Sequence, residues 1–318
     1  MKYIVTGAAG FIGGHVAEAL LKRSDSVVII DDLSAGNQEQ VDYLLSKGDA
    51  VFYKQKVEEN LDHIFEKEKP DGVFHLAAQP RVQFTIAEPM KSHEMNVQAT
   101  VNILDACRRF EVPRFVFSST CALYGDQEKM PITEEAVPNP LSPYAVHKIV
   151  GEYYCKLYTL LYGVETIMLR YFNVYGPRQN PEGAYANLIC RFVDKFLKGE
   201  VPTINGDGTH TRDYVFVRDI VNANLLAMDT ANKEAIGNVF NVTGGDETSV
   251  NDIVREIKKY LPTELTPKNG PDVVEPKTVH GDASKIQKML GWKAEMNLEQ
   301  GMKETIEYFV TKKAQEGL

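Results

Sequence analysis

The segment S-P-Y-A-V-H-K, residues 142–148, places Tyr144 four residues before Lys148. A run typical of a helix follows, and on an α-helix the side chains at positions i and i+4 lie on one face, about one turn apart. An ammonium group beside a phenol favours the phenolate, so Lys148 could lower the pKa of Tyr144 from its usual value of about 10 and create a base that works near neutral pH. Two surface residues of a helix can have the same spacing, so this interpretation depends on the rest of the chain.

A second chemical signal lies in the first turn of the chain. The stretch T-G-A-A-G-F-I-G spaces Gly7, Gly10 and Gly13 as G-x-x-G-x-x-G, directly after an apolar run and directly before a helical pattern. Glycines at such a turn let the backbone approach a pyrophosphate, whose charge meets the free N–H groups and the positive dipole end of the helix. An ordinary tight turn between a strand and a helix is the alternative interpretation.

The end of the second apolar run selects among dinucleotides. About twenty residues after the glycines, this run ends in Asp31 and Asp32, the spacing of the dinucleotide-binding pattern. A carboxylate at this point can accept hydrogen bonds from a ribose 2′-OH and repels a 2′-phosphate. The sequence therefore predicts NAD as the cofactor in preference to NADP.

These residues can act together only if the fold brings them to one edge of a sheet. Short apolar runs alternate with helical patterns, and the runs are apolar on both faces, as expected for a parallel sheet covered by helices on each side. A helix is predicted over residues 15–23, and strands are predicted over 2–7, 26–32, 50–53, 72–77, 114–119 and 164–170. The predicted fold class is α/β, a Rossmann-type doubly wound parallel sheet.

The alternation of strands and helices breaks after residue 172. The stretch N-V-Y-G-P-R-Q-N-P-E-G is rich in Pro, Gly and Asn and predicts a loop, and the later elements alternate less regularly, with one helix predicted over 249–261. We therefore expect an NAD-binding Rossmann domain over 1–172, to which part of 214–242 returns. Residues 173–318 are expected to form mainly a smaller C-terminal substrate-binding lobe.

Composition limits the function classes. The chain has 318 residues, 43% of them hydrophobic, and a net charge of -9, which argues against nucleic acid as the main partner because phosphate backbones are bound by basic surfaces. The amino terminus lacks a signal-peptide layout and no apolar run approaches the ~18 residues of a membrane span, so we expect a cytoplasmic protein with no membrane partner. Four cysteines without C-x-x-C spacing predict reduced thiols and no metal site; they are Cys107, Cys121, Cys155 and Cys190.

Several longer motifs together resemble a known family. In chain order they are T-G-A-A-G-F-I-G, D-D-L-S-A-G-N, H-L-A-A, S-S-T-C-A-L-Y-G, S-P-Y-A-V-H-K, R-Y-F-N-V-Y-G-P-R, I-N-G-D-G-T-H-T-R-D-Y-V-F-V-R-D-I and D-A-S-K-I-Q-K-M-L-G-W. In this order they resemble the extended short-chain dehydrogenases/reductases, and among these the nucleotide-sugar epimerases typified by UDP-glucose (UDP-galactose) 4-epimerase. The resemblance covers almost the full length of the chain.

The resemblance implies a reaction with named residues. It implies NAD-dependent 4-epimerisation of a UDP-hexose through a transient 4-keto intermediate, with Tyr144 as the base for the sugar 4-hydroxyl. Lys148 would lower the pKa of Tyr144 and hold the nicotinamide ribose, and Thr120 would bond the reacting oxygen. Ser119 is a weaker substitute for Thr120, and Cys121 is interpreted as a packing residue.

The resemblance also implies binding residues. Cofactor binding is expected at Gly7, Gly10, Phe11, Ile12, Gly13, Asp31, Asp32, Ser34, Gly36, Asn37, Val57, Leu76, Ala77, Ala78, Asn96, Ser118, Tyr144, Lys148 and Tyr171. Substrate binding is expected at Thr120, Tyr144, Asn173, Asn187, Leu188, Thr203, Asn205, Arg212 and Val279. Arg212 would grip the diphosphate with its forked guanidinium, and an ion pair with Asp213 or Asp219 is the alternative role.

The chain departs from the family pattern at three places. Asp272, in D-V-V-E, stands where these epimerases carry an arginine that bonds the nucleotide, and Lys56-Val57 stands where an aspartate caps the adenine. Val279 stands where a bulky aromatic residue excludes N-acetyl groups, so by shape the site admits a 2-acetamido sugar. The identity of the nucleotide and the use of UDP-glucose, UDP-galactose or their N-acetyl forms stay open.

Other functions on the same fold remain alternatives. A 4,6-dehydratase would place Asp-Glu directly after the threonine, because elimination needs an acid and a base, whereas Cys121-Ala122 follows Thr120 here. A decarboxylase or a reductase of nucleotide sugars is also considered, and a non-catalytic NAD-binding regulator is disfavoured by the intact Tyr144, Lys148 and Thr120. The resemblance further implies a homodimer in which helices near 91–109 and 144–162 pair as a four-helix bundle.

Overall fold

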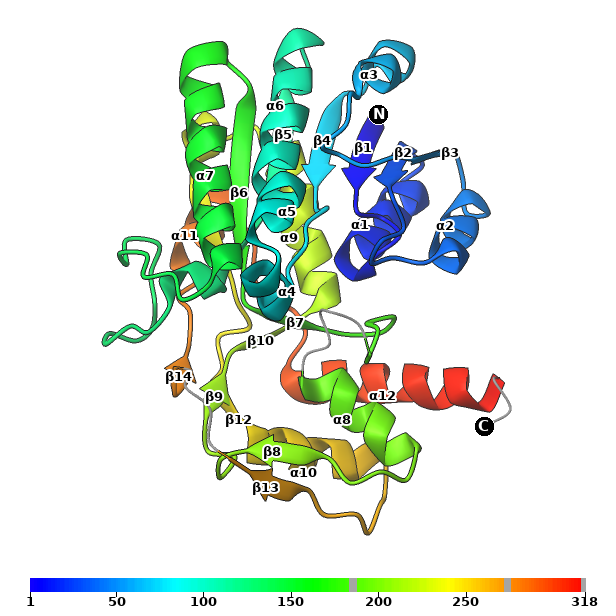
Figure 1. The fold of residues 1–318 in the computed structure, drawn as a ribbon, viewed down its shortest axis with the longest axis vertical. Coiled ribbons are helices and arrows are strands. Elements are labelled where there is room, and N and C mark those ends of the chain that lie inside the picture. Colours follow the sequence, from blue (N-terminus) through cyan, green and yellow to red (C-terminus); the bar gives the residue numbers. More distant parts are fainter. Residues whose placement is uncertain (183–187, 272–275, 316–318) are drawn as a thin grey trace.

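A seven-stranded parallel sheet forms the centre of the protein. The computed structural model describes residues 1–182, 188–271 and 276–315. The strand order is β11-β6-β5-β4-β1-β2-β3, and every neighbouring pair runs parallel (Figure 1). The strands are β1 (Lys2–Thr6), β2 (Ser26–Asp31), β3 (Ala50–Lys54), β4 (Gly72–His75), β5 (Arg114–Thr120), β6 (Glu165–Tyr171) and β11 (Val239–Val242). The prediction of a doubly wound parallel sheet is confirmed.

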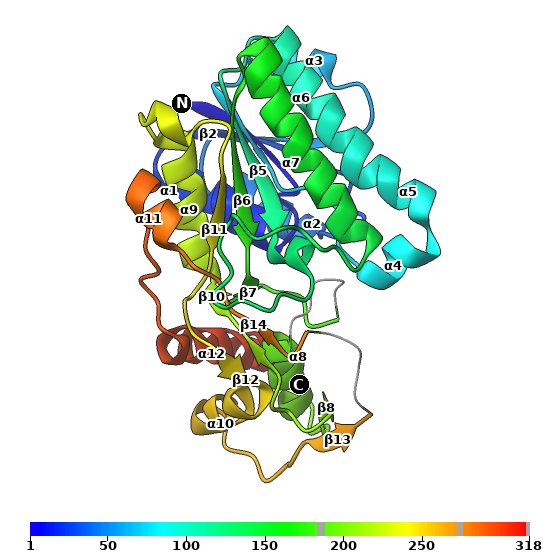
Figure 2. The same cartoon turned by 90° about the vertical axis from the view of Figure 1, so that its left-hand side faces the viewer.

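Helices cover both faces of this sheet, as Figure 2 shows. On one face lie α3 (Asp62–Glu68), α6 (Ala99–Arg109) and α7 (Pro143–Tyr162), and on the other lie α1 (Phe11–Lys22), α9 (Val217–Asp229) and α11 (Ser284–Leu290). Each face has its own apolar core, because strands such as β1 bury side chains on both sides. The sheet edge that carries the strand ends is thereby fixed between two rigid layers.

The ends of α7 follow from its sequence. Ser142 caps the helix by accepting a hydrogen bond from the Ala145 N–H, and Pro143 fits the first turn because its missing N–H would have no partner there. Gly163 ends the helix in a left-handed conformation, with φ of 74°. These signals place Tyr144 in the first turn of α7, directly beside the end of β5.

A smaller lobe lies beyond the carboxyl ends of the strands (Figure 1). Its helices α8 (Leu188–Leu197), α10 (Val250–Tyr260) and α12 (Leu298–Gln315) share a separate apolar core that includes Phe192, Ile253 and Ile306. Short strands complete the lobe and its junction with the large unit: β7 (Asn173–Tyr175), β8 (Thr203–Asn205), β9 (Thr211–Arg212), β10 (Tyr214–Phe216), β12 (Thr248–Ser249), β13 (Lys268–Gly270) and β14 (Thr278–Val279).

After the first part of the lobe, the chain returns to the unit that contains the seven-stranded sheet. Helix α9 packs against α1 and the sheet, and β11 pairs with β6 as the last strand. In the described part of the chain, no helix combines the length and the apolar character that crossing a lipid bilayer requires.

Candidate active site

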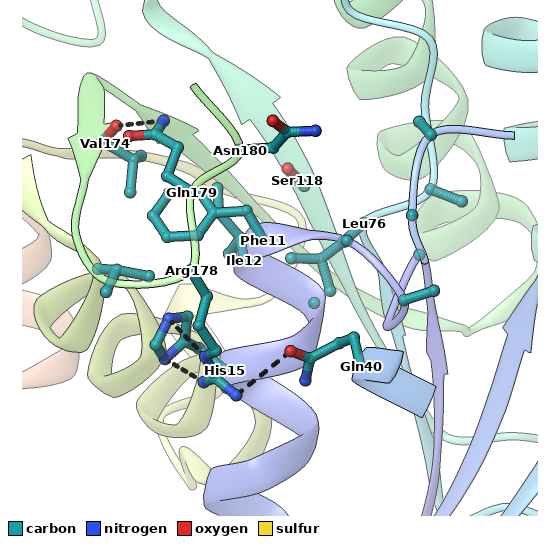
Figure 3. Close-up of a pocket in the computed structure, with 18 of the residues that line it drawn as sticks. Phe11, Ile12, His15, Gln40, Leu76, Ser118, Val174, Arg178, Gln179 and Asn180 are labelled. Carbon is teal, nitrogen blue, oxygen red and sulfur yellow. Dashed lines mark hydrogen bonds between the residues drawn. The ribbon is translucent and has the colours of Figure 1, made fainter. Parts of the chain in front are cut away.

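A cleft of about 1220 Å³ opens along the carboxyl ends of the central strands. It is lined by the first glycine turn, the loop after β2, the ends of β4 and β5, the start of α7, and the segment that follows β7. Figure 3 labels lining residues from α1, from the ends of β4 and β5, and from the segment that follows β7. Ligands of doubly wound sheets bind outside the carboxyl ends of the strands, so this cleft is the expected position for a site.

The glycine turn approaches its neighbours too closely for side chains. A Cβ at Gly7, which has φ of +74°, would lie 2.8 Å from the Ala77 nitrogen, and a Cβ at Gly13 would lie 2.3 Å from the Gly7 carbonyl oxygen. Helix α1 begins at Phe11 without a side-chain cap and without an acidic residue in its first turn. Its N-terminal N–H groups therefore offer a positive end to an anion in the cleft.

Asp31 ties the glycine turn to the loop that follows β2. Its carboxylate accepts hydrogen bonds from the Ala9 N–H at 3.0 Å and the Leu33 N–H at 2.9 Å, while Asp32 accepts from the Ser34 N–H at 2.8 Å. Burial raises the pKa of Asp31, and the two backbone bonds oppose this increase. An uncapped helix start beside two carboxylates at the end of β2 fits the pyrophosphate and the adenosine ribose of NAD.

A directed chain of hydrogen bonds supports the wall of the cleft after β4. The Thr6 hydroxyl oxygen accepts from the N–H groups of Leu76 and Ala77, both at 3.1 Å, so its own proton points to Nδ1 of His75, 2.8 Å away. His75 then donates from Nε2 to the Thr100 hydroxyl at 3.1 Å. Burial lowers the pKa of His75 to about 3, which keeps the ring neutral and this direction of bonding fixed.

Asn96 holds the same wall from the opposite side. It lies in the π-helical turn Glu94–Gln98, accepts from the Gln79 N–H at 2.6 Å and donates to the Gln79 carbonyl at 2.9 Å. Its side chain thus replaces a strand partner for this loop. Among the described residues, Asn96 is the predicted cofactor residue that does not line the cleft, and its action passes through Gln79.

The residues with the predicted catalytic spacing meet at the end of β5. Lys148 is buried and its Nζ donates to the Ser118 carbonyl at 2.6 Å, and it lies 5.9 Å from the centre of the Tyr144 ring. Thr120 ends β5 and accepts a hydrogen bond from the Ala122 N–H. Tyr144, Lys148 and Thr120 all line the cleft.

The acidities of this group differ from the expectation based on spacing. Burial raises the pKa of Tyr144, and the Thr120 hydroxyl lowers it in part. Burial also lowers the pKa of Lys148 to about 8, against the opposing influence of Cys155 and Glu152. The predicted lowering of the Tyr144 pKa by Lys148 is not realised in this arrangement, because the ammonium group bonds the Ser118 carbonyl and desolvation dominates at the phenol.

A buried ion pair supports the end of β5 from behind. Nη2 of Arg170 lies 2.7 Å from Oε2 of Glu152, and both side chains are about 95% buried, with exposures of 6% and 5%. The Ser119 hydroxyl donates to Glu152 Oε1 at 2.6 Å, and Arg170 donates to the Tyr124 hydroxyl at 2.8 Å. Ser119 also lines the cleft, but its hydroxyl is bound to Glu152, so it fixes the residue next to Thr120.

Asn173 connects the cleft to the lobe. Both its backbone N–H and its side-chain amide donate to the Asp213 carbonyl, at 3.1 and 3.0 Å. The buried Asp213 carboxylate in turn accepts from the Gly244, Gly245 and Gly281 N–H groups and from the Thr243 hydroxyl. Burial raises the pKa of Asp213, and the hydrogen bonds from these four donors oppose this increase. They replace the water that would otherwise solvate the carboxylate.

The other predicted substrate residues lie in the lobe. Leu188 begins α8, Thr203 and Asn205 lie on β8, and Val279 on β14 pairs with Arg212 on β9. Within the described part of the chain, these five residues lie outside the lining of the cleft. Arg212 donates to the Thr211 carbonyl at 2.8 Å. Asn187 and Asp272 lie outside the described residues.

All other predicted site residues are brought together by the fold. The cleft lining contains Gly7, Gly10, Phe11, Ile12, Gly13, Asp31, Asp32, Ser34, Gly36, Asn37, Val57, Leu76, Ala77, Ala78, Ser118, Thr120, Tyr144, Lys148, Tyr171 and Asn173. Sequence reasoning missed the support beneath them, namely His75, Glu152, Arg170 and Asp213. A polar residue inside an otherwise apolar strand, as at His75 and Arg170, is a signal that could have found two of these residues.

Metal and thiol chemistry have no geometric basis in the described chain. Residues 1–182, 188–271 and 276–315 contain no group of three His, Cys, Asp or Glu side chains placed to hold a metal ion. Cys121 follows Thr120 directly, and burial raises the pKa of its thiol to about 12. A thiol with this pKa is protonated at neutral pH, so Cys121 is unsuited to act as a nucleophile.

The sequence matches a family of known proteins and several relatives over most of its length. Residues 3–243 match the NAD dependent epimerase/dehydratase family. A putative UDP-glucose 4-epimerase of Methanocaldococcus jannaschii is 37% identical over 312 residues, which cover 96% of this chain and 97% of the relative.

Solved structures agree with the sequence match. UDP-glucose 4-epimerase of Thermotoga maritima, crystallised with UDP-glucose, superposes with a TM-score of 0.92 at 36% identity, covering 98% of this chain and 99% of that one. UDP-N-acetylglucosamine 4-epimerase of Methanobrevibacter ruminantium, in complex with UDP-N-acetylmuramic acid, gives 0.91 at 32% identity, with 98% of each chain covered.

Proposed function

The chain belongs to the NAD-dependent epimerase/dehydratase family, and from this premise we propose that it interconverts the C4 epimers of a UDP-hexose. The observation that carries this proposal is the meeting of Tyr144, Lys148 and Thr120 with the glycine turn in one cleft. UDP-glucose and UDP-galactose are the proposed substrates. The enzyme is an isomerase, and its cofactor is NAD.

The reaction needs a redox cofactor although no net oxidation occurs. The C4–H bond of a hexose is not acidic, so inversion at C4 proceeds through a 4-keto sugar, whose carbonyl carbon is planar. NAD, when bound, supplies a hydride acceptor and, once reduced, the hydride that returns to the opposite face. The glycine turn, the uncapped start of α1 and Asp31 are the residues that would hold it.

Tyr144 is the proposed acid and base. Its phenolate takes the proton of the 4-hydroxyl as C4 is oxidised, and the phenol so formed returns that proton when the ketone is reduced. The Thr120 hydroxyl bonds the reacting oxygen and also favours the phenolate, the form that accepts the proton. Lys148, fixed by the Ser118 carbonyl, is proposed to hold the nicotinamide ribose and to place positive charge near the phenol.

The keto sugar must turn over before hydride returns, so the nucleotide is anchored while the sugar is held loosely. Asn173, at the cleft, is proposed to contact the sugar side of the substrate, and the lobe residues are proposed to bind the diphosphate and base. These are Asn187, Leu188, Thr203, Asn205 and Arg212. Val279 lies beside Arg212 in the small sheet, and its side chain is smaller than the aromatic residue expected there. On this basis N-acetylated UDP-hexoses are proposed as further substrates.

Assembly and location form a separate part of the proposal. We propose a homodimer through α7, because this helix exposes an apolar row at helical spacing, formed by Val146, Tyr153, Leu157, Leu160 and Leu161. A cytoplasmic location is proposed because the four cysteines, all within the described residues, form no disulfide. The division into an NAD-binding domain over 1–172, to which part of 214–242 returns, and a mainly substrate-binding lobe over 173–318 is supported by the separate apolar core of the lobe.

Product analysis without added cofactor tests the proposed function. Purified protein is incubated with UDP-glucose, UDP-galactose and their N-acetyl forms, and the sugars are resolved chromatographically. We expect each pair to reach the same equilibrium mixture from either side, with no net change in bound NAD. Loss of water would identify a dehydratase, release of carbon dioxide from a UDP-uronate a decarboxylase, and stoichiometric use of reduced cofactor a reductase. Bound NAD without turnover would identify a non-catalytic binding protein.

A further inference from the structure

Residues 176–181 form a strap that runs along the cofactor side of the cleft. The strap follows β7, and its residues from Pro177 to Pro181 line the cleft together with Phe11 and His15 of α1. Its backbone is unusual, because Gly176 has φ of +153° and Arg178 has φ of +67°. A left-handed conformation is rare for a residue with a side chain, so contacts of the strap must hold Arg178 in place.

The guanidinium of Arg178 reaches from the strap onto α1, as Figure 3 shows. Nη2 lies 2.6 Å from Nδ1 of His15 and donates to Oε2 of Glu18 at 2.7 Å. The pair with Glu18 is largely buried, with side-chain exposures of 18% for Arg178 and 13% for Glu18. A planar, permanently charged fork suits this arrangement, since one nitrogen serves two acceptors on the same helix.

His15 has the protonation state that this contact requires. Its Nε2 lies 2.9 Å from the Pro177 carbonyl and 3.3 Å from Nε of Arg178. A carbonyl oxygen can only accept, so Nε2 carries the proton and Nδ1 is left to accept from Nη2 of Arg178. Burial and the charge of Arg178 together lower the pKa of His15 to about 4. The neutral ring thus bonds two successive residues of the strap.

The Arg178 guanidinium also contacts α2 (Gln38–Leu45), the next helix after α1. Nη1 of Arg178 lies 3.5 Å from Oε1 of Gln40 (Figure 3). The guanidinium also lies 5.6 Å from the centre of the Tyr43 ring. Both residues belong to α2, which begins directly after the loop that Asp31 and Asp32 open. The Arg178 side chain therefore joins the strap to α1, which follows the glycine turn, and to α2, which follows the loop after β2.

We propose that Arg178 is a positioning residue that fastens the strap to α1 and α2 and thereby retains the dinucleotide in the cleft during catalysis. The inference rests on the proposed function, because an epimerase must keep the reduced cofactor between the two hydride transfers. Release of the reduced cofactor at that point would leave a 4-keto sugar and an enzyme unable to reduce it.

Cofactor retention in Arg178→Ala and Glu18→Gln tests the inference. Each protein is purified with its bound NAD, and the exchange of that NAD for radiolabelled NAD is followed together with the NAD content after dialysis. We expect exchange at least tenfold faster in Arg178→Ala, a smaller acceleration in Glu18→Gln, and activity that added NAD restores with the KM for the UDP-sugar unchanged. Arg178→Lys should exchange faster than the parent protein, because an ammonium group cannot bond His15, Glu18 and Gln40 together.

A matched control separates retention from general stability. Arg114 forms a comparable partly buried ion pair with Glu165 at 2.7 Å, at the opposite end of β5, and does not line the cleft. Arg114→Ala should lower the melting temperature and leave NAD exchange within twofold of the parent. Equal exchange in Arg178→Ala and the parent, or equal acceleration in Arg178→Ala and Arg114→Ala, would overturn the role of Arg178. If the parent itself neither holds NAD nor epimerises a UDP-sugar, the proposed function fails instead.

Discussion

At the scale of single residues, the chemistry depends on a phenol whose environment opposes its ionisation. Tyr144 is desolvated, and the group that lowers its pKa in the structure is the Thr120 hydroxyl. Tyr144 and Lys148 both line the cleft, but their spacing did not predict which acceptor the ammonium group bonds. The Ser118 carbonyl belongs to β5, whereas Lys148 lies on α7. No local pattern in 142–148 predicts this contact between two elements.

Removal of the phenolic oxygen alone isolates its role. Tyr144→Phe should lower kcat by roughly 10²–10⁴-fold, the range typical of a lost general acid–base, while the protein keeps its bound NAD. Steady-state kinetics and the NAD content of the purified variant give the two measurements. Tyr153→Phe, on an exposed turn of the same helix, is the control and should leave kcat unchanged. Full activity in Tyr144→Phe would assign the proton transfer to another residue.

The ion pair behind β5 should matter for stability. Glu152→Gln leaves the Arg170 guanidinium buried without its carboxylate, and breaking a buried pair in this way costs about 3–5 kcal/mol of unfolding free energy. Urea denaturation measures the loss. The control Glu304→Gln breaks an exposed pair with Arg218 and should cost less than about 1 kcal/mol. Equal effects of the two substitutions would contradict the structural importance of the buried pair.

At the scale of elements, the first strand, turn and helix act as one unit. The pattern of Gly7, Gly10 and Gly13 predicted this unit because each glycine answers a local steric demand. Its supports were hidden from the sequence, since His75 and Thr100 become neighbours of Thr6 only when β4 and α6 pack beside β1. Local patterns thus predicted the elements that line the cleft, whereas the contacts between elements needed the structure.

Helix α1 has no space for one additional carbon near its start. In Gly13→Ala the new methyl group would approach the Gly7 carbonyl oxygen, a backbone atom, to 2.3 Å, so the turn or the helix must move. We expect at least tenfold weaker NAD binding, measured by titration of the cofactor-free protein. Gly48→Ala, where the nearest atom is a Leu21 side-chain carbon at 3.3 Å, should bind NAD like the parent.

The neutral ring of His75 makes the central sheet sensitive to acid. Its folded pKa of about 3 lies below the usual value of about 6.5, so between these values the unfolded chain binds the extra proton and stability falls as pH decreases. Over the change from pH 8 to pH 5, His75 alone should account for about 2 kcal/mol of lost unfolding free energy. Denaturation curves for the parent and for His75→Asn should show a shallower pH dependence in the variant. An unchanged slope would mean that other groups dominate acid unfolding.

At the scale of the whole molecule, the exposed row on α7 is the feature that a single chain leaves unexplained. Leu157 and Leu160 have exposures of 45% and 78%, which is unfavourable for large apolar side chains on one helix face unless a partner covers them. The double variant Leu157→Lys, Leu160→Lys should be monomeric by light scattering, whereas the parent should be a dimer. Val310→Lys, an exposed apolar position on α12, should remain dimeric. A monomeric parent protein would remove this part of the proposal.

The position of β11 has a consequence for the order in which the protein matures on the ribosome. Six of the seven sheet strands are complete once Tyr171 has emerged. The edge of β6 stays open until residues 239–242 arrive, after all of α8 and β8–β10 has been synthesised. During translation, the nascent sheet therefore presents unpaired backbone along one side for the time needed to add nearly seventy residues. A chain cut after residue 172 would lack β11, so the edge of β6 would stay unpaired.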